Sequence, residues 1–199
     1  MYCPNCGKEI PEDISANMEH TGSVVSWHGV KYFGYISAAS AVACIILIFQ
    51  KLISMPELRN ILGKKVPQEY SLYGLMDNAS NIFGKANVEK MELVFKGLFA
   101  LGIVCAALLA YSLVVFVIKR TFVPNGGMAF VATIWLCVAI ITFGLAMNAW
   151  AGEEVAKRVM SFEGPLVEFA WTLYLLAAFS VIGRVLTYLE RRLTKKKRA

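Results

Sequence analysis

The sequence predicts an all-α fold in which a bundle of four transmembrane helices follows a short N-terminal segment with a Cys-x-x-Cys pair. Hydrophobic residues make up 57% of the 199 residues and charged residues only 17%, whereas soluble domains have about 45–50% and about 25%. The apolar residues are concentrated in four blocks of about twenty residues, each long enough to cross a hydrocarbon core of about 30 Å as a helix. Composition and clustering together therefore indicate a multi-pass membrane protein.

The predicted crossings carry very little charge. The first block is uncharged until Lys51, and Trp27 and Tyr32 precede it, where interfacial aromatic residues are expected. The second and third blocks are uncharged, and the fourth contains only Glu168 and Arg184. Both of these side chains can extend to the nearer interface, which argues against an ion pathway through the bundle. The four crossings are residues 33–53, 97–118, 128–149 and 165–189.

Short connections and basic residues predict the topology. Pro124-Asn125-Gly126-Gly127 is typical of a tight turn between the second and third crossings, and Gly164-Pro165 places a proline at the first position of the fourth helix. Four crossings put both termini on the same side of the membrane, and that side carries eleven basic residues, six of them in the tail at residues 190–199. By the positive-inside rule, both termini are expected on the cytoplasmic side of the cell membrane.

The net charge of +6 has a membrane interpretation. Much of it lies in the C-terminal tail directly after an apolar block, where basic residues set topology and contact anionic lipid head groups. The predicted partner is therefore the lipid bilayer and not nucleic acid. In the second crossing, Gly102, Ala106 and Ala110 recur every four residues, a spacing that lets helices approach closely. For this stripe, packing inside one chain is favoured over a dedicated face for a homo-oligomer.

The N-terminal segment, residues 1–26, contains the motif that says most about chemistry, Cys3-Pro4-Asn5-Cys6-Gly7-Lys8. A Cys-x-x-Cys turn places two sulfur atoms on one side of a tight loop, where both can bind a metal ion at about 2.3 Å. This stretch resembles the first knuckle of the short zinc ribbons found at the N-termini of many bacterial membrane proteins. The resemblance covers residues 1–22 and implies a zinc-ribbon-like knuckle there, with a structural zinc ion as its cofactor.

The second knuckle departs from that family's pattern. Such ribbons normally have a second Cys-Pro-x-Cys-Gly, but here Asn17 occupies the position of the third cysteine and His20 that of the fourth. The resemblance therefore implies Cys3, Cys6 and His20 as metal ligands. Three interpretations remain open. His20 with a neighbouring acid or histidine completes the site in one chain, two chains share their cysteine pairs in a homo-oligomer, or the ribbon is degenerate and binds metal weakly or not at all.

The predicted extracytoplasmic loop, residues 54–96, is the largest piece outside the membrane. Ser54-Met55-Pro56-Glu57 is typical of a helix start, and Asn87 is expected to cap a helix that continues into the second crossing. The loop is too rich in apolar residues for a simple linker. We expect it to pack on the bundle or to lie in the membrane interface, with a partner or ligand site as the alternative.

The sequence contains no convincing set of catalytic residues. Its two histidines both precede the first crossing, and neither a Gly-x-Ser-x-Gly motif nor a phosphate loop is present. Cys44, Cys105 and Cys137 lie in different crossings and are interpreted as small apolar packing residues. We therefore predict a non-enzymatic scaffold, regulatory or assembly protein of the membrane with a cytosolic metal-binding knuckle. The alternative is a small channel or transporter formed by the bundle or by its oligomer.

Overall fold

The structure, a computed structural model, describes residues 27–56, 69–119, 122, 125–156 and 165–196. Over these ranges the chain is mostly helical, which confirms the predominance of α-helix expected from the sequence. The elements in chain order are α2 (Trp27–Ile48), β1 (Ile53–Ser54), β2 (Glu69–Tyr70), α4 (Leu72–Asp77), α5 (Ala79–Lys119), α6 (Asn125–Ala156), β3 (Glu168–Phe169) and α7 (Trp171–Lys196).

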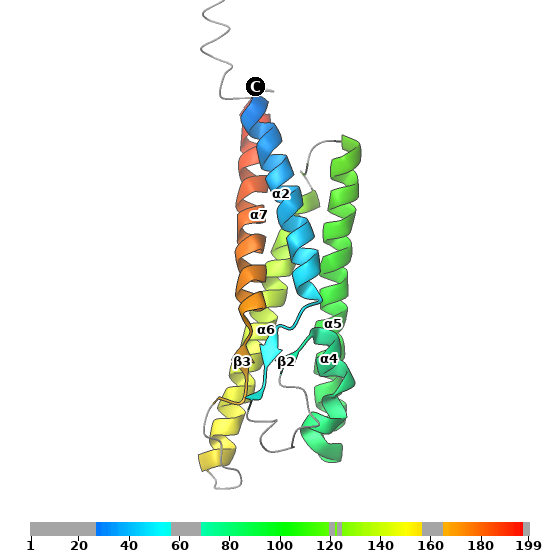
Figure 1. Ribbon diagram of the computed structural model, residues 1–199, viewed down its shortest axis with the longest axis vertical. Coiled ribbons are helices and arrows are strands. Elements are labelled where there is room, and N and C mark those ends of the chain that lie inside the picture. Colours follow the sequence, from blue (N-terminus) through cyan, green and yellow to red (C-terminus); the bar gives the residue numbers. More distant parts are fainter. Residues whose placement is uncertain (1–26, 57–68, 120–121, 123–124, 157–164, 197–199) are drawn as a thin grey trace, which may run out of the picture.

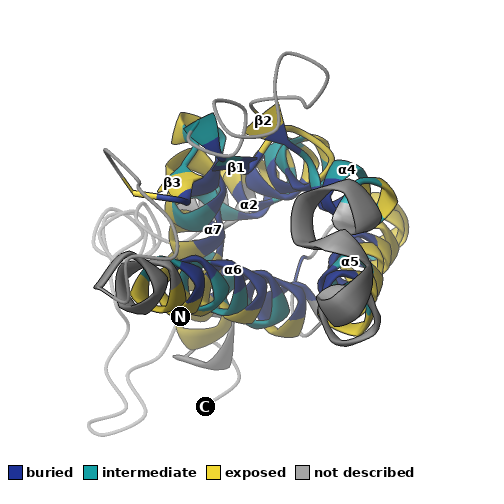
Figure 2. Cartoon of the chain, turned by 90° about the horizontal axis from the view of Figure 1, so that it is seen from below, coloured by how far each residue is buried: buried dark blue, intermediate teal, exposed yellow. Residues whose placement is uncertain are grey.

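The long helices of the described ranges, α2, α5, α6 and α7, lie side by side and alternate in direction (Figure 1). Both α2 and α6 pack on α5 and on α7, so the helices form a closed ring. Viewed along the bundle, their buried faces turn inward and their exposed faces outward (Figure 2). We name the two ends of the bundle by what lies there. The start of α2, the α5–α6 turn and the end of α7 lie at the terminal end, and the strands lie toward the opposite, loop end (Figure 1).

The long helices bury a residue at alternating spacings of three and four. A mean spacing of about 3.5 residues is the period of coiled coils and of left-handed helical bundles. This spacing differs from the four-residue spacing of the predicted stripe of small residues. Gly102 and Ala106 of that stripe are buried, whereas Ala110 is exposed. The buried positions of these seams are 34, 37, 41, 44 and 48 in α2; 95, 98, 102, 105, 109, 112 and 116 in α5; 126, 130, 133, 137, 140, 144 and 147 in α6; and 173, 176, 180, 183, 187 and 190 in α7.

Three helices of the described part are long and apolar enough to cross a membrane, at Glu92–Lys119, Gly126–Trp150 and Trp171–Leu193. Helix α2 has 22 residues and contributes a shorter apolar stretch, Tyr32–Ile48. Large hydrophobic side chains are also exposed on the outside of the bundle, among them Ile118, as expected of surfaces that face lipid. These features indicate a multi-pass membrane protein.

Two helix boundaries differ from the predicted ones because a small antiparallel sheet forms toward the loop end. Helix α2 ends at Ile48 and not at Ile53, and α7 begins at Trp171 and not at Pro165. Among the described strands the order is β2-β1-β3, with β1 in the centre. Strand pairing satisfies the backbone N–H and C=O groups of the apolar segments that leave the helices. Ile53 is therefore fully buried without being helical.

Side chains fasten this sheet to the bundle. Lys51 Nζ forms an ion pair with Glu69 at 2.9 Å, and the hydroxyl of Thr172 donates to the carbonyl oxygen of Lys51. Asn148 of α6 donates to the carbonyl oxygen of Val167 at 2.9 Å and accepts from the Val167 N–H at 2.7 Å. The segments before α7 and after α2 are thus held against the helices by hydrogen bonds as well as by apolar contacts.

The described part of the predicted loop packs on the bundle as a cap. Tyr70, Leu72 and Leu75 are buried in the hydrophobic core. Helix α5 begins before the expected cap, so that Asn87 lies inside the helix and does not start it. The helix expected to begin at Ser54 falls mostly outside the described residues, and Ser54 itself lies in β1.

Candidate functional site

The predicted metal ligands Cys3, Cys6 and His20 lie outside the described residues. Helix α2, which follows them, begins at Trp27 at the terminal end (Figure 1). Among the residues that the structure describes, no group of three or more His, Cys, Asp or Glu side chains is placed to hold a metal ion. The zinc site therefore remains a prediction, and the terminal end is the part of the bundle nearest to it in sequence.

At the terminal end, the carboxyl group of Glu190 in α7 is almost fully buried, with an exposed fraction of 2%. Its Oε1 atom accepts a hydrogen bond of 3.4 Å from the backbone N–H of Phe122, between α5 and α6. The same oxygen lies 3.7 Å from the position that a Cβ atom would take on Gly34 in α2. Burying a carboxyl group costs free energy unless it is hydrogen-bonded. Glu190 thus connects α7 to the α5–α6 turn while lying against α2.

Aromatic rings surround this carboxyl group. The ring of Phe122 lies 6.0 Å from that of Phe116 and stacks at 5.7 Å on that of Phe130. Tyr35 meets Phe116 edge-on at 5.4 Å. The three phenylalanine side chains are buried. Together the rings pack at the terminal end of the bundle, close to Glu190.

Small residues on neighbouring helices make this packing feasible. A Cβ atom on Gly183 of α7 would overlap the ring of Phe130, and one on Gly126 of α6 would overlap the ring of Phe122. The atoms that a Cβ would overlap belong to bulky buried rings. A methyl group at either position therefore requires the rings to move. At Gly183, α7 therefore has no space for a larger side chain beside the phenylalanine cluster.

Four hydroxyl groups in the bundle interior are satisfied within their own helices, whereas the Ser37 hydroxyl of α2 is buried with no hydrogen-bond partner among the described residues. Ser112, Thr133, Ser180 and Thr187 are buried, and each donates to a backbone carbonyl oxygen three or four residues earlier, at 2.6 to 2.9 Å. Such hydroxyls form local bonds and no chain of side-chain hydrogen bonds along the bundle. The interior is thus built for packing.

The cysteines of the crossings belong to this interior layer. Cys44, Cys105 and Cys137 are free and buried, which agrees with their interpretation as packing residues. The sulfur atom of Cys44 lies 3.6 Å from the Ser180 hydroxyl across the α2–α7 seam. Cys105 of α5 lies close to Thr133 of α6. These contacts join neighbouring helices near the middle of the bundle.

No family model, curated protein or solved structure matches this chain. Its function therefore has to be inferred from its own residues and their packing.

The sequence prediction begins the basic tail at Glu190, whereas the structure places Glu190 in α7 with its side chain buried. Its position in the chain does carry a signal. Ser180, Gly183, Thr187 and Glu190 follow one another at spacings of three, four and three, which puts them on one face of a helix. Small and polar residues in that order, on an otherwise apolar helix, indicate a face turned toward other helices.

Proposed function

We propose that this chain is a non-enzymatic membrane scaffold whose four long helices cross the cell membrane and present both termini on the cytoplasmic side. The observation that carries the proposal is the filled interior of the bundle. Its seams pack side chains at coiled-coil spacing, and the phenylalanine cluster closes the terminal end around Glu190. A bundle filled in this way gives a rigid support for the segments that leave it.

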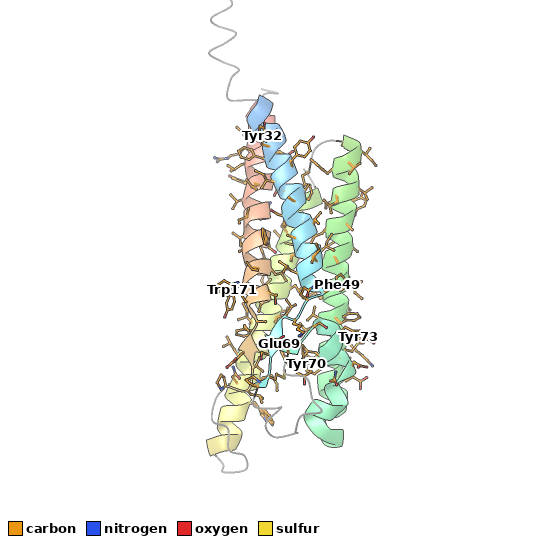
Figure 3. All side chains as sticks on the ribbon, in the orientation of Figure 1. Tyr32, Phe49, Glu69, Tyr70, Tyr73 and Trp171 are labelled. Carbon is orange, nitrogen blue, oxygen red and sulfur yellow. The ribbon has the colours of Figure 1, made fainter. Side chains whose placement is uncertain are left out.

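Exposed aromatic side chains support four crossings, including α2. Phe49, Tyr73 and Trp171 have exposed fractions of 54%, 57% and 75%. Phe49 and Trp171 lie at similar levels near the middle of the long axis, and Tyr73 lies further toward the loop end (Figure 3). Tyr32, with an exposed fraction of 62%, lies near the terminal end (Figure 3). Phe49, just after the end of α2, follows Tyr32 by seventeen positions, a length of about 26 Å along a helix. That separation suits two aromatic belts on either side of a hydrocarbon core.

The knuckle is proposed to be the working part of the scaffold. Cys3 and Cys6, with His20 or with the cysteine pair of a second chain, would bind zinc in a structural role. Residues 1–26 precede α2, and both the start of α2 and the end of α7 lie at the terminal end (Figure 1). This arrangement would offer a metal-stabilised contact surface and a basic tail on one side of the membrane.

Metal analysis of the purified full chain tests this proposal. We expect wild-type protein to carry zinc and the Cys3→Ser/Cys6→Ser variant to lose it. His20→Ala should lose zinc if the site lies within one chain and keep it if two chains share their cysteines. Equal zinc content in wild type and in the double-cysteine variant would contradict the metal assignment.

The alternative function, a small channel or transporter, rests on the polar residues Ser180, Thr187 and Glu190 in the seam of α7. Solute flux into proteoliposomes separates the two proposals. A scaffold should give no flux above that of empty vesicles. Uptake or conductance that Glu190→Gln removes would favour the transporter over the scaffold.

A further inference from the structure

The outward face of α7 at the terminal end is lined by basic residues. Arg184, Tyr188, Arg191 and Arg192 border a concave surface with a volume of about 490 Å³. Positions separated by four, seven and eight residues fall within a sector of about 100° on a helix. Because all four residues belong to α7, this is an open surface along one helix and not an enclosed cleft. The four side chains therefore share one face of the helix, which is open to a lipid head group.

Over the described residues, no carboxylate lies within ion-pair distance of Arg184 or Arg192; the ion pairs are Lys51–Glu69 and Lys96–Glu92. Glu190, which lies between the arginines in sequence, is buried on the opposite face with Phe122. The Arg192 guanidinium lies 5.4 Å from the centre of the Tyr188 ring, a cation–π contact that limits its freedom.

Arg184 places a charge within an apolar span. It lies inside the stretch Trp171–Leu193, and its Nη1 atom is only 2.8 Å from the position that a Cβ would take on Gly127, in the first turn of α6. Its guanidinium thus reaches across from α7 to the first turn of α6. An arginine at this depth favours an anionic partner, and lipid phosphates lie at the level of the interface.

We propose that this face of α7 binds the phosphate head group of an anionic phospholipid. Guanidinium groups bind phosphate oxygens through paired N–H donors, and the Tyr188 hydroxyl is available as a further donor. The site rests on the proposed membrane insertion of the chain, but it does not depend on the zinc knuckle. It differs from the general attraction of the basic tail because it requires particular side chains on one helix face.

Native mass spectrometry of the detergent-solubilised full chain tests the site by comparing binding of phosphatidylglycerol with that of phosphatidylcholine. Each basic residue near a membrane surface contributes about fivefold to affinity. We therefore expect Arg184→Gln to lower the preference for phosphatidylglycerol about fivefold, and Arg184→Gln combined with Arg192→Gln to lower it about thirtyfold. Lys119→Gln is the matched control, because Lys119 is an exposed basic residue at the same end but outside the concave surface.

Two further measurements identify the chemical group that the site recognises. Arg184→Lys keeps the charge but loses the paired donors, so we expect it to lower the lipid preference almost as much as Arg184→Gln does. Inorganic phosphate should not displace the bound lipid. Complete displacement by inorganic phosphate would overturn the lipid assignment, and equal losses in Arg184→Gln and Lys119→Gln would overturn the site.

Folding of each variant is checked by circular dichroism and size-exclusion chromatography. If Arg184→Gln does not fold, Arg192→Gln supplies the test alone, since its exposed side chain is less coupled to the packing. Unchanged lipid preference in a folded Arg192→Gln would then overturn the site. Failure of the lipid site would leave the chain membrane-embedded, whereas failure of the proposed membrane insertion would appear as a chain that is soluble without detergent.

Discussion

At the scale of single residues, two buried polar groups differ in their surroundings. The Glu190 carboxyl accepts a hydrogen bond from the Phe122 N–H. The Tyr70 hydroxyl, by contrast, is buried with no hydrogen-bond partner among the described residues. Removing a buried acceptor leaves its donor unsatisfied, whereas removing an unpaired hydroxyl takes away a cost. Substitutions at these two positions are therefore expected to change the free energy of unfolding in different directions.

Glu190→Ala should lower the free energy of unfolding by about 1–3 kcal/mol, because the Phe122 N–H would be left buried without its acceptor. The measurement is denaturant or thermal unfolding of the purified chain in detergent. Glu168→Ala is the control, since Glu168 is an exposed acid in β3 and its loss should have little effect. Wild-type stability in Glu190→Ala would show that the carboxyl group does not anchor the terminal end.

Tyr70 gives a prediction about pH. Burial raises the pKa of its phenol above the ordinary value of 10.0, because desolvation disfavours the charged form. The folded state then keeps its proton to a higher pH than the unfolded state does. The contribution of the protonated Tyr70 phenol to the free energy of unfolding is therefore fully present below pH 10. It decreases as the pH rises through the raised pKa of the folded state.

Tyr70→Phe should remove this alkaline loss and should leave stability at neutral pH unchanged or slightly higher. Unfolding measured at neutral pH and above pH 10 provides the comparison. Tyr73→Phe is the matched control, because Tyr73 is 57% exposed. If wild type and Tyr70→Phe lose the same stability at alkaline pH, the assignment to Tyr70 is wrong.

At the scale of elements, the helices are held together by seams that combine bulky and small residues. The α2–α7 seam contains Gly34, Ser37, Ala41 and Cys44 on one side and Ser180, Gly183 and Thr187 on the other. Small residues let helix backbones approach closely, which strengthens van der Waals contact where lipid supplies no hydrophobic driving force. A larger side chain at such a position is expected to separate the helices.

Gly183→Ala tests the seam directly. The added methyl group would overlap the Phe130 ring, and overpacking of this kind costs about 1–3 kcal/mol. Gly97→Ala in α5 is the control, because a Cβ there meets nothing within 4 Å and alanine is the better helix former. Thermal unfolding in detergent should therefore show a lower midpoint for Gly183→Ala only. Equal midpoints for the two variants would contradict the close packing described for α7.

The helices were predictable from sequence because membrane-spanning length is a local property of the chain. Each apolar block lies largely within a helix, but the ends at Ile48 and Trp171 depend on strand pairing between segments far apart in sequence. The buried state of Glu190 depends on Phe122 and Gly34 in the same way. Periodicity of about 3.5 residues in α7 could have indicated its inward face. Its partners could be known only from the tertiary structure.

At the scale of the whole molecule, the account depends on the bundle lying in a membrane with the terminal end in the cytoplasm. Three described helices are long and apolar enough to cross, and the exposed aromatic side chains suit two interfaces. The zinc knuckle, the lipid-binding face of α7 and the basic tail are all proposed at the terminal end. If α2 crosses the membrane, these three features lie together on one side of it.

Labelling of intact cells with a membrane-impermeant thiol reagent measures this most directly. The account predicts that the thiol introduced by Glu69→Cys at the loop end is labelled in intact cells. Native Cys3 and Cys6, freed of bound zinc by a chelator, and the thiol introduced by Lys119→Cys at the terminal end, should react only after permeabilisation. Cys44, Cys105 and Cys137, which are buried in the bundle, should stay unlabelled in both conditions. Labelling of Cys3 and of the Glu69→Cys thiol from the same side of the membrane would contradict a crossing by α2 and with it the proposed architecture.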